Sequence, residues 1–226
     1  MKKILIATPS YDGKVDVWYA SALHATTILG LQNDILFHPV FMSYDALIQR
    51  SRNDLVALAV EQEFDGMLWI DADMEWAAQW AIDIVNSERD VFGLPVIKKS
   101  ITEESYNVKC KIEDLNPDEN GLLKVESIGT GFLYLSKKAF THLWDNSEPY
   151  THNGKDKRWI FEVGLKDGDI ISEDVKMCSR LLEGGFDIII DTTKTCNHVG
   201  NLKYMGDFSG FIKKIKSFQE ENNNGH

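Results

Sequence analysis

Paired cysteines are absent from this sequence. Its 226 residues include three cysteines, Cys110, Cys178 and Cys196, and none of them belongs to a C-x-x-C pair. An odd number of widely spaced cysteines does not predict a disulfide framework, and the spacing does not match a thiolate zinc site. We therefore expect reduced thiols that are mostly buried and behave as small apolar side chains.

Long apolar runs are missing as well. No stretch approaches the ~20 apolar residues that a membrane-spanning helix needs. The apolar stretch after Lys3 is four residues long, which is too short for the core of a signal peptide. These absences predict a soluble, cytoplasmic protein with no membrane span.

Basic residues are in deficit. The chain has 24 Lys and Arg against 35 Asp and Glu, which gives a formal net charge of −11 with histidine neutral. Proteins that bind nucleic acid mainly through its phosphate backbone need a basic face. The charge balance therefore opposes a nucleic-acid partner.

The remaining composition, with 43% hydrophobic and 26% charged residues, is that of a globular protein. It predicts one α/β domain over residues 1–219 and a short disordered tail at 220–226. In the first half, short apolar strands alternate with segments of helical periodicity, which predicts parallel strands joined by right-handed crossovers. We expect strands at 3–8, 35–42, 66–70, 90–96, 123–127, 132–136 and 186–191, and helices at 15–29, 44–63, 77–85, 137–144, 172–183 and 208–218.

Two aspartates directly follow an expected strand, in the sequence Asp71-Ala72-Asp73. The spacing itself has little weight, because 20 aspartates give about two D-x-D triplets by chance. The chain has two such triplets, the other being Asp167-Gly168-Asp169 in a glycine-containing loop. Position has more weight, since ligands of open parallel sheets bind beyond the carboxyl ends of the strands. A divalent cation would compensate the two carboxylates, and a solvated turn is the alternative.

Two further polar clusters occur later in the chain. Ser172-Glu173-Asp174 precedes an expected helix and, taken alone, is typical of helix capping with acids near the positive end of the dipole. His198 follows the strand expected at 186–191, and a lone loop histidine is usually just exposed. Like the aspartates, both clusters lie behind apolar strands, so a parallel sheet could bring all three features to one edge.

Aromatic and basic residues add secondary candidates. Tyr11 and Trp76 flank the expected site, whereas Trp18 and Trp69 lie within an expected helix and strand and are expected in the core. The basic clusters at 98–99 and 155–158 are expected to be solvated surface.

Six short segments occur in a characteristic order: Thr8-Pro9-Ser10-Tyr11, Arg50-Ser51-Arg52-Asn53, Leu68-Trp69-Ile70-Asp71-Ala72-Asp73-Met74, Gly129-Thr130-Gly131-Phe132, Ser172-Glu173-Asp174 and His198-Val199-Gly200. This ordered set resembles nucleotide-sugar glycosyltransferases of the GT-A fold, and among them compact viral and fungal members similar to mannan-polymerase subunits. The likeness covers the chain from about Lys3 to Gly200. It implies a single-domain α/β fold with a Rossmann-like, mostly parallel central sheet flanked by helices. The loop from Lys98 to Gly121 carries no matching motif.

The resemblance also implies roles for individual residues. Asp73 and His198 would ligate a metal ion, and Asp71, counted with the metal site, would hold the ribose or a metal-bound water. Asp174 would be the base near the acceptor hydroxyl, with Glu173 beside it as a second catalytic candidate. The residues implied to contact the nucleotide sugar are Thr8, Pro9, Ser10, Tyr11, Arg52, Asn53, Asp71, Ala72 and Gly131.

Physical chemistry favours a metal in such a site. A chain of charge −11 would repel a diphosphate of about −2 unless a cation bridges them. Carboxylate, imidazole and phosphate ligands suit Mn²⁺, with Mg²⁺ next. The expected function is therefore a metal-dependent glycosyltransferase of the hexosyltransferase class. It would move a sugar from a UDP- or GDP-sugar donor to the hydroxyl of a glycan or another acceptor.

Two other functions compete with this expectation. A non-catalytic protein that binds nucleotide sugars or carbohydrate on the same scaffold is poorly separated by sequence, because a fold does not fix an activity. A phosphatase or phosphotransferase with an aspartate nucleophile would carry its D-x-D after the first strand, where this chain has Thr8-Pro9-Ser10.

Overall fold

A seven-stranded sheet forms the centre of the molecule. The computed structural model describes residues 1–224. The strand order is β2-β1-β3-β9-β5-β14-β7. Five strands run in one direction, while β9 and β7 run antiparallel to their neighbours, so the expected mostly parallel sheet is confirmed with two inverted strands. The bounds are Lys2–Ser10 (β1), Ile35–Ser43 (β2), Gly66–Ile70 (β3), Val91–Gly93 (β5), Leu122–Lys124 (β7), Phe132–Ser136 (β9) and Ile188–Asp191 (β14).

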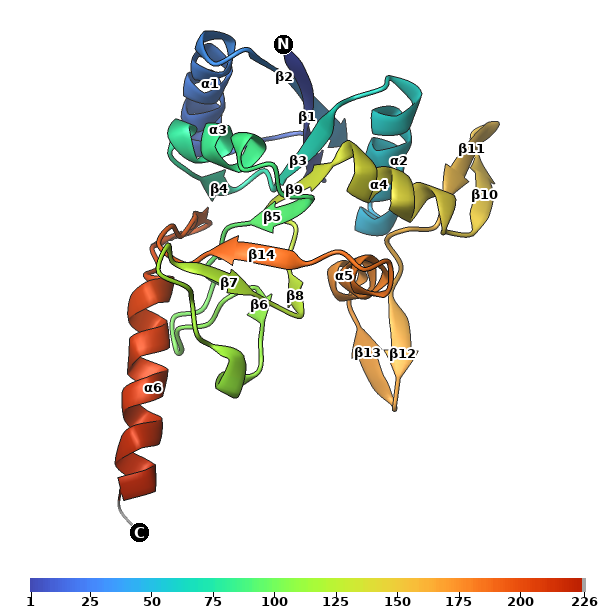
Figure 1. Cartoon of the computed structure of the whole chain (residues 1–226). Coiled ribbons are helices and arrows are strands. Elements are labelled where there is room, and N and C mark those ends of the chain that lie inside the picture. Colours follow the sequence, from blue (N-terminus) through green and yellow to red (C-terminus); the bar gives the residue numbers. More distant parts are fainter. Residues whose placement is uncertain (225–226) are drawn as a thin grey trace.

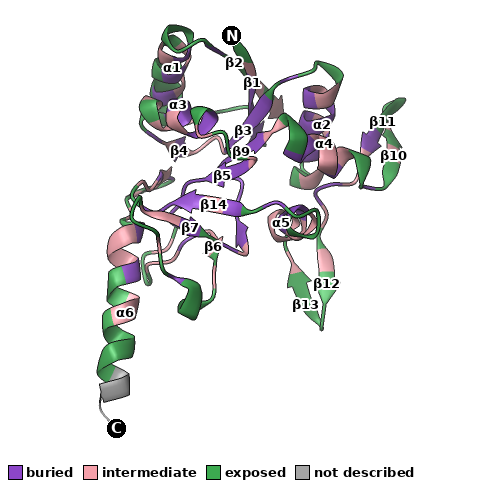
Figure 2. Ribbon diagram, in the orientation of Figure 1, coloured by how far each residue is buried: buried purple, intermediate pink, exposed green. Residues whose placement is uncertain are grey.

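Helices cover both faces of this sheet (Figure 1). Successive side chains of a strand point to opposite faces, and in β1 this sends Ile4 and Ile6 toward α1 and α3, and Leu5 and Ala7 toward α2, α4 and α5. All four residues are fully buried. The inner strands of the sheet, such as β3, β5 and β14, are accordingly among the most deeply buried elements in Figure 2. The helices are Val17–Gln32 (α1), Ile48–Glu61 (α2), Ala78–Asn86 (α3), Lys137–Asp145 (α4), Glu173–Glu183 (α5) and Phe208–Asn224 (α6).

A small three-stranded sheet, β16-β15-β4, brings a late segment of the chain to the edge of the large sheet. Its register places His198 of β15 opposite Met74 of β4, and the Val199 N–H donates to the carbonyl oxygen of Asp73 at 2.8 Å. Backbone pairing therefore fixes His198 beside Asp73, in a strand rather than in the expected loop. The short elements are Met74–Glu75 (β4), Val108–Lys109 (β6), Ser127–Ile128 (β8), Asn197–Val199 (β15), Lys203–Tyr204 (β16) and the 3₁₀ turn Ile112–Asp114.

Two hairpins form in segments where the sequence predicted no strand. β10, Pro149–His152, and β11, Lys155–Arg158, form the first. The second consists of β12, Gly164–Lys166, and β13, Asp169–Ile171, and it projects beyond α5 (Figure 1). These strands are only three or four residues long, too short to show the apolar alternation from which a strand is recognised.

The C-terminal helix α6 extends further than expected. It begins at Phe208, as the sequence indicates, but continues to Asn224. Most of the expected tail at 220–226 is therefore helical, which agrees with the good helix propensity of Glu220 and Glu221 at its start. Residues 225–226 lie outside the described residues. In the described part of the chain, no helix combines the length and the apolarity needed to cross a membrane.

Candidate functional site

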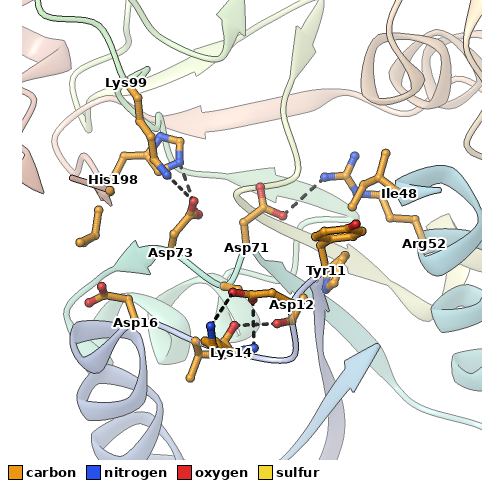
Figure 3. A pocket seen from close by; sticks show the side chains of 16 residues that line it. Tyr11, Asp12, Lys14, Asp16, Ile48, Arg52, Asp71, Asp73, Lys99 and His198 are labelled. Atoms are coloured by element: carbon orange, nitrogen blue, oxygen red, sulfur yellow. Dashed lines mark hydrogen bonds and ion pairs between the residues drawn. The ribbon is translucent and has the colours of Figure 1, made fainter. Parts of the chain in front are cut away.

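An open cavity of about 570 Å³ lies beyond the carboxyl ends of β1 and β3 (Figure 3). The parallel register of these strands brings their ends to one edge of the sheet. The loop after β1, the turn at 71–73 after β3, and residues 198–200 line the cavity. Ile48 and Arg52 of α2 and Lys99 complete the lining. Tyr11 lies at its mouth and is 72% exposed.

Two basic side chains, those of Lys99 and His198, lie beside Asp73 in this cavity. The Lys99 Nζ lies 2.5 Å from Asp73 Oδ2, and His198 Nε2 lies 3.4 Å from Asp73 Oδ1. The other ring nitrogen of His198, Nδ1, lies 3.0 Å from the carbonyl oxygen of Ile97. Because a carbonyl can only accept, Nδ1 carries the proton, and Nε2 is directed at the carboxylate.

Asp71 has a different partner, the guanidinium of Arg52. Arg52 Nη2 lies 3.5 Å from Asp71 Oδ1, while Nη1 of the same group donates to Glu173 Oε1. The Arg52 side chain is only 7% exposed and lies over the ring of Phe161 at 5.7 Å. One buried arginine therefore holds a carboxylate from the turn after β3 and a carboxylate from the start of α5.

The two aspartates of the triplet differ in their electrostatics. Desolvation by the surrounding protein raises the pKa of Asp71, although a third of its side chain reaches solvent; Arg52 opposes this shift and the charge of Asp73 adds to it. Desolvation also acts on Asp73, but hydrogen bonds with His198 and Lys99 outweigh it and lower the pKa of Asp73. Asp73 is therefore the carboxylate that the fold stabilises in its charged form.

A second cavity of about 150 Å³ shares Arg52, Asp71 and His198 with the first. Thr130 lines it, and its hydroxyl is buried without a hydrogen-bond partner; the same is true of Arg52 Nε. Buried polar atoms normally have partners, so the walls of this cavity contain two unsatisfied polar groups. Gly131 allows close packing here, since a Cβ would lie 3.1 Å from Val96 Cγ2.

Asp174 faces the smaller cavity from the first turn of α5. Its Oδ2 would lie 3.2 Å from a Cβ placed on Gly129, and its Oδ1 accepts from the Ser172 hydroxyl. Ser172 occupies the N-cap position, as expected, but its hydroxyl bonds Asp174 instead of a backbone N–H of the helix.

Most residues implied by the resemblance lie at these two cavities, but Thr8 and Asn53 do not. The Thr8 hydroxyl is buried against Tyr19 Oη at 2.5 Å. The Asn53 amide is fully buried and binds the backbone of Ile160 and Phe161, so it holds that segment on α2 and does not reach the nucleotide side. The larger cavity is lined by Pro9, Ser10, Tyr11, Arg52, Asp71, Ala72, Asp73 and His198. The smaller one is lined by Arg52, Asp71, Gly131, Glu173, Asp174 and His198.

Lys99 is a site residue that the sequence did not reveal, since it was expected on the solvated surface. Its place shortly after the strand at the same sheet edge was the available signal. Asn107, from the loop without a motif, lines the smaller cavity and accepts the Val96 N–H through Oδ1 at 2.8 Å. Lys157 was also expected to be solvated, but it is buried and pairs with Asp54 at 3.3 Å.

Two of the expectations for tryptophan are wrong. Trp76 is buried and donates from Nε1 to Thr26 Oγ1 at 2.9 Å, so it belongs to the core. Trp18 is 47% exposed, with Lys203 Nζ 4.1 Å from its ring centroid. Trp69 is fully buried, as expected.

The residues fit a divalent cation in part. A protonated Nδ1 on a backbone carbonyl is the usual arrangement of a metal-ligating histidine, and it aims Nε2 of His198 at Asp73. Asp71, the third expected ligand, is turned toward Arg52. Among residues 1–224, no group of three or more His, Cys, Asp or Glu side chains is arranged to hold a metal. Asp73 and His198 therefore suit an ion that takes its other ligands from a phosphate and water.

Comparison with known proteins gives the fold alone. No protein-family model matches the chain, and no curated protein matches its sequence. The structure is similar to the crystal structure of A197 from STIV, with a TM-score of 0.54 and 16% identity over 88% of this chain and 86% of that one. A glycosyltransferase involved in the glycosylation of the major capsid of PBCV-1 has a TM-score of 0.35 and 10% identity, over 62% and 63% of the two chains, which is too low to support an inference. The chain thus has a mixed α/β fold with a large, mostly parallel central sheet, as in Rossmann-like folds.

Proposed function

We propose that this protein is a glycosyltransferase that moves a monosaccharide from a nucleoside-diphosphate sugar to an acceptor hydroxyl. The observation that carries this proposal is the pair of cavities, of about 570 and 150 Å³, that meet at Arg52, Asp71 and His198. The larger has the size of a nucleotide site, and the smaller has unpartnered polar groups of Thr130 and Arg52 in its walls. The bond between diphosphate and sugar would lie at their junction.

The larger cavity would hold the donor nucleotide, either UDP or GDP. The exposed ring of Tyr11 provides a face on which a base can stack. Asp73 and His198 would hold Mn²⁺ or Mg²⁺, which, when bound, offsets negative charge on the leaving diphosphate. Arg52 keeps the turn after β3 and the start of α5 together, because it pairs with Asp71 and Glu173 at once.

The smaller cavity would hold the transferred sugar and the attacking group. Thr130 and Arg52, whose Oγ1 and Nε have no partner within the protein, would lie beside the hydroxyls of the sugar. The acceptor oxygen would form a bond to the anomeric carbon as the bond from that carbon to the β-phosphate oxygen breaks. Asp174 would accept the proton of the acceptor hydroxyl, since its carboxylate faces this cavity.

Incubation with a panel of UDP- and GDP-sugars and Mn²⁺ tests the proposal, with donor binding measured by calorimetry and released nucleoside diphosphate by a coupled assay. Asp174→Asn should keep donor binding and lower turnover by at least about 100-fold. Asp169→Asn, the same change in the projecting hairpin, should alter neither.

Three results would contradict parts of the proposal. If no donor of the panel binds or is cleaved, the glycosyltransferase assignment is wrong. If a donor binds but no sugar is transferred or hydrolysed, the protein is a nucleotide-sugar binder. Unchanged turnover in Asp174→Asn would remove Asp174 from the base role.

A further inference from the structure

The ammonium of Lys99 occupies the side of Asp73 that a cation would use. Lys99 Nζ lies 2.5 Å from Asp73 Oδ2, while His198 takes the other oxygen (Figure 3). Both side chains of this ion pair line the larger cavity and remain about a third exposed, at 35% for Lys99 and 39% for Asp73. The pair is therefore accessible to ions from solution.

Lys99 differs from Arg52, another cation of the cavity, in its freedom to move. The Arg52 side chain is 7% exposed and bound by two carboxylates. The Lys99 side chain instead crosses Gly200, where an added Cβ would lie 3.3 Å from Cδ and 3.4 Å from Cε. Because Gly200 has no side chain, the flexible lysine stem can lie across its backbone without obstruction.

A divalent ion and this ammonium cannot both bind Asp73 Oδ2 closely, because like charges a few ångströms apart repel strongly. We propose that Lys99 is a built-in counter-ion of the metal site. In the resting protein it neutralises Asp73; a divalent ion displaces it, and the released ammonium then binds the diphosphate of the donor. This inference rests on the proposed function, because it assumes that Asp73 is a metal ligand.

The charge balance of the loaded site supports this second role. A diphosphate of about −2 together with the Asp73 carboxylate exceeds the charge of one divalent ion by one unit. Arg52 is already shared between Asp71 and Glu173, so its charge is committed. The displaced Lys99 supplies the missing positive charge from within the same cavity.

Mn²⁺ titration without nucleotide, followed by electron paramagnetic resonance of the free ion, tests the competition. Lys99→Gln should bind Mn²⁺ about tenfold more tightly than the native chain, because a competing positive charge is removed. Lys203→Gln is the matched control: it also breaks a 2.5 Å ion pair, with Glu75, in the adjacent small sheet. Its Mn²⁺ affinity should stay within about twofold of the native value.

Calorimetry of nucleoside diphosphate binding at saturating Mn²⁺ tests the second role. Here Lys99→Gln should bind UDP or GDP about tenfold more weakly, the opposite direction to its effect on Mn²⁺. A merely structural role of Lys99 would weaken both. Gly200→Ala, which keeps the charge but crowds the lysine stem, should raise Mn²⁺ affinity by a smaller factor.

The outcomes separate this inference from the proposed function. Equal or weaker Mn²⁺ binding by Lys99→Gln, or no binding by either protein, overturns the counter-ion role, and it does so even if donor sugars are turned over. Mn²⁺ binding that appears or tightens in Lys99→Gln supports the role. Lack of donor turnover in a chain that shows this gain contradicts the glycosyltransferase proposal alone.

Discussion

Replacing Arg52 with methionine should destabilise the protein by about 2–4 kcal/mol at neutral pH. Removal of one partner from a buried ion pair costs about 3–5 kcal/mol, because the remaining charge is left buried and unpaired. Glu173 is 16% exposed and Asp71 34%, so water reaches both carboxylates to some extent and the expected loss is lower. Methionine retains an unbranched apolar stem against Phe161, which limits the part of the loss due to packing.

The loss should depend on pH. In Arg52→Met the carboxylates of Asp71 and Glu173 face each other without a cation between them. Desolvation already raises the pKa of Asp71, and Arg52 opposes this shift, so its removal raises the pKa further. Protonation of Asp71 removes the unpaired charge, and the loss should therefore be greatest near pH 7.5 and smaller at pH 5.

Urea denaturation followed by circular dichroism at both pH values measures the effect. Arg50→Met is the control on the same helix: Arg50 pairs with Asp45 at 2.6 Å but is 36% exposed, and exposed pairs contribute at most about 1 kcal/mol. A loss in Arg52→Met that equals the loss in Arg50→Met, or that is the same at both pH values, would show that Arg52 does not compensate buried charge.

Three further predictions concern the same cavity. In the metal-free protein, Asp71→Asn should raise stability at neutral pH, because desolvation raises the pKa of Asp71 and the fold therefore disfavours its charged form. The gain should vanish below about pH 4, where the carboxyl is protonated in the folded and the unfolded protein. Asp73→Asn should lower stability at neutral pH by about 0.5–1 kcal/mol, because hydrogen bonds with His198 and Lys99 outweigh desolvation and lower the pKa of Asp73. This cost should vanish in acid, where the carboxylate is protonated. Thermal melts across pH 3–8 measure both variants, and a change of the same sign in the two would contradict the pKa directions. Tyr11→Ala should weaken nucleotide binding by about 1–3 kcal/mol if the ring stacks on the base, whereas Tyr44→Ala, exposed but outside the cavity lining, should leave calorimetric affinity unchanged.

The sequence predicted the elements that have regular apolar patterns. β3 was placed at its observed bounds, and the strands before and after it were placed within a few residues. Since parallel strands end at one edge, the positions of Ser10 and Asp71 at the same cavity followed from these patterns. The inverted direction of β9 and β7 did not follow, because apolar runs carry no information on strand direction.

Contacts between distant segments were beyond sequence reasoning. Arg52 and Glu173 are 121 residues apart, and Lys99 and Asp73 are 26 apart. No sequence pattern indicates that either pair is in contact, because the order of the strands in the sheet brings these residues together. The same is true of Asn53, which stands beside Arg52 in sequence but points into the core, because α2 turns the two side chains toward different surroundings.

The two carboxylates of the triplet illustrate why a motif cannot assign roles by spacing. Asp71 shares one arginine with Glu173 and is disfavoured as an anion by burial, whereas Asp73 has an ammonium and an imidazole to itself. For a cation that enters the cavity, Asp73 presents a carboxylate whose charged form is stabilised, whereas the carboxylate of Asp71 is already paired with Arg52. Because the partners come from the loop after β5 and from β15, α2 and α5, this asymmetry exists only in the folded chain. Under the proposed function, this asymmetry would direct a divalent ion to Asp73 and leave Asp71 to hold Arg52 between the two cavities.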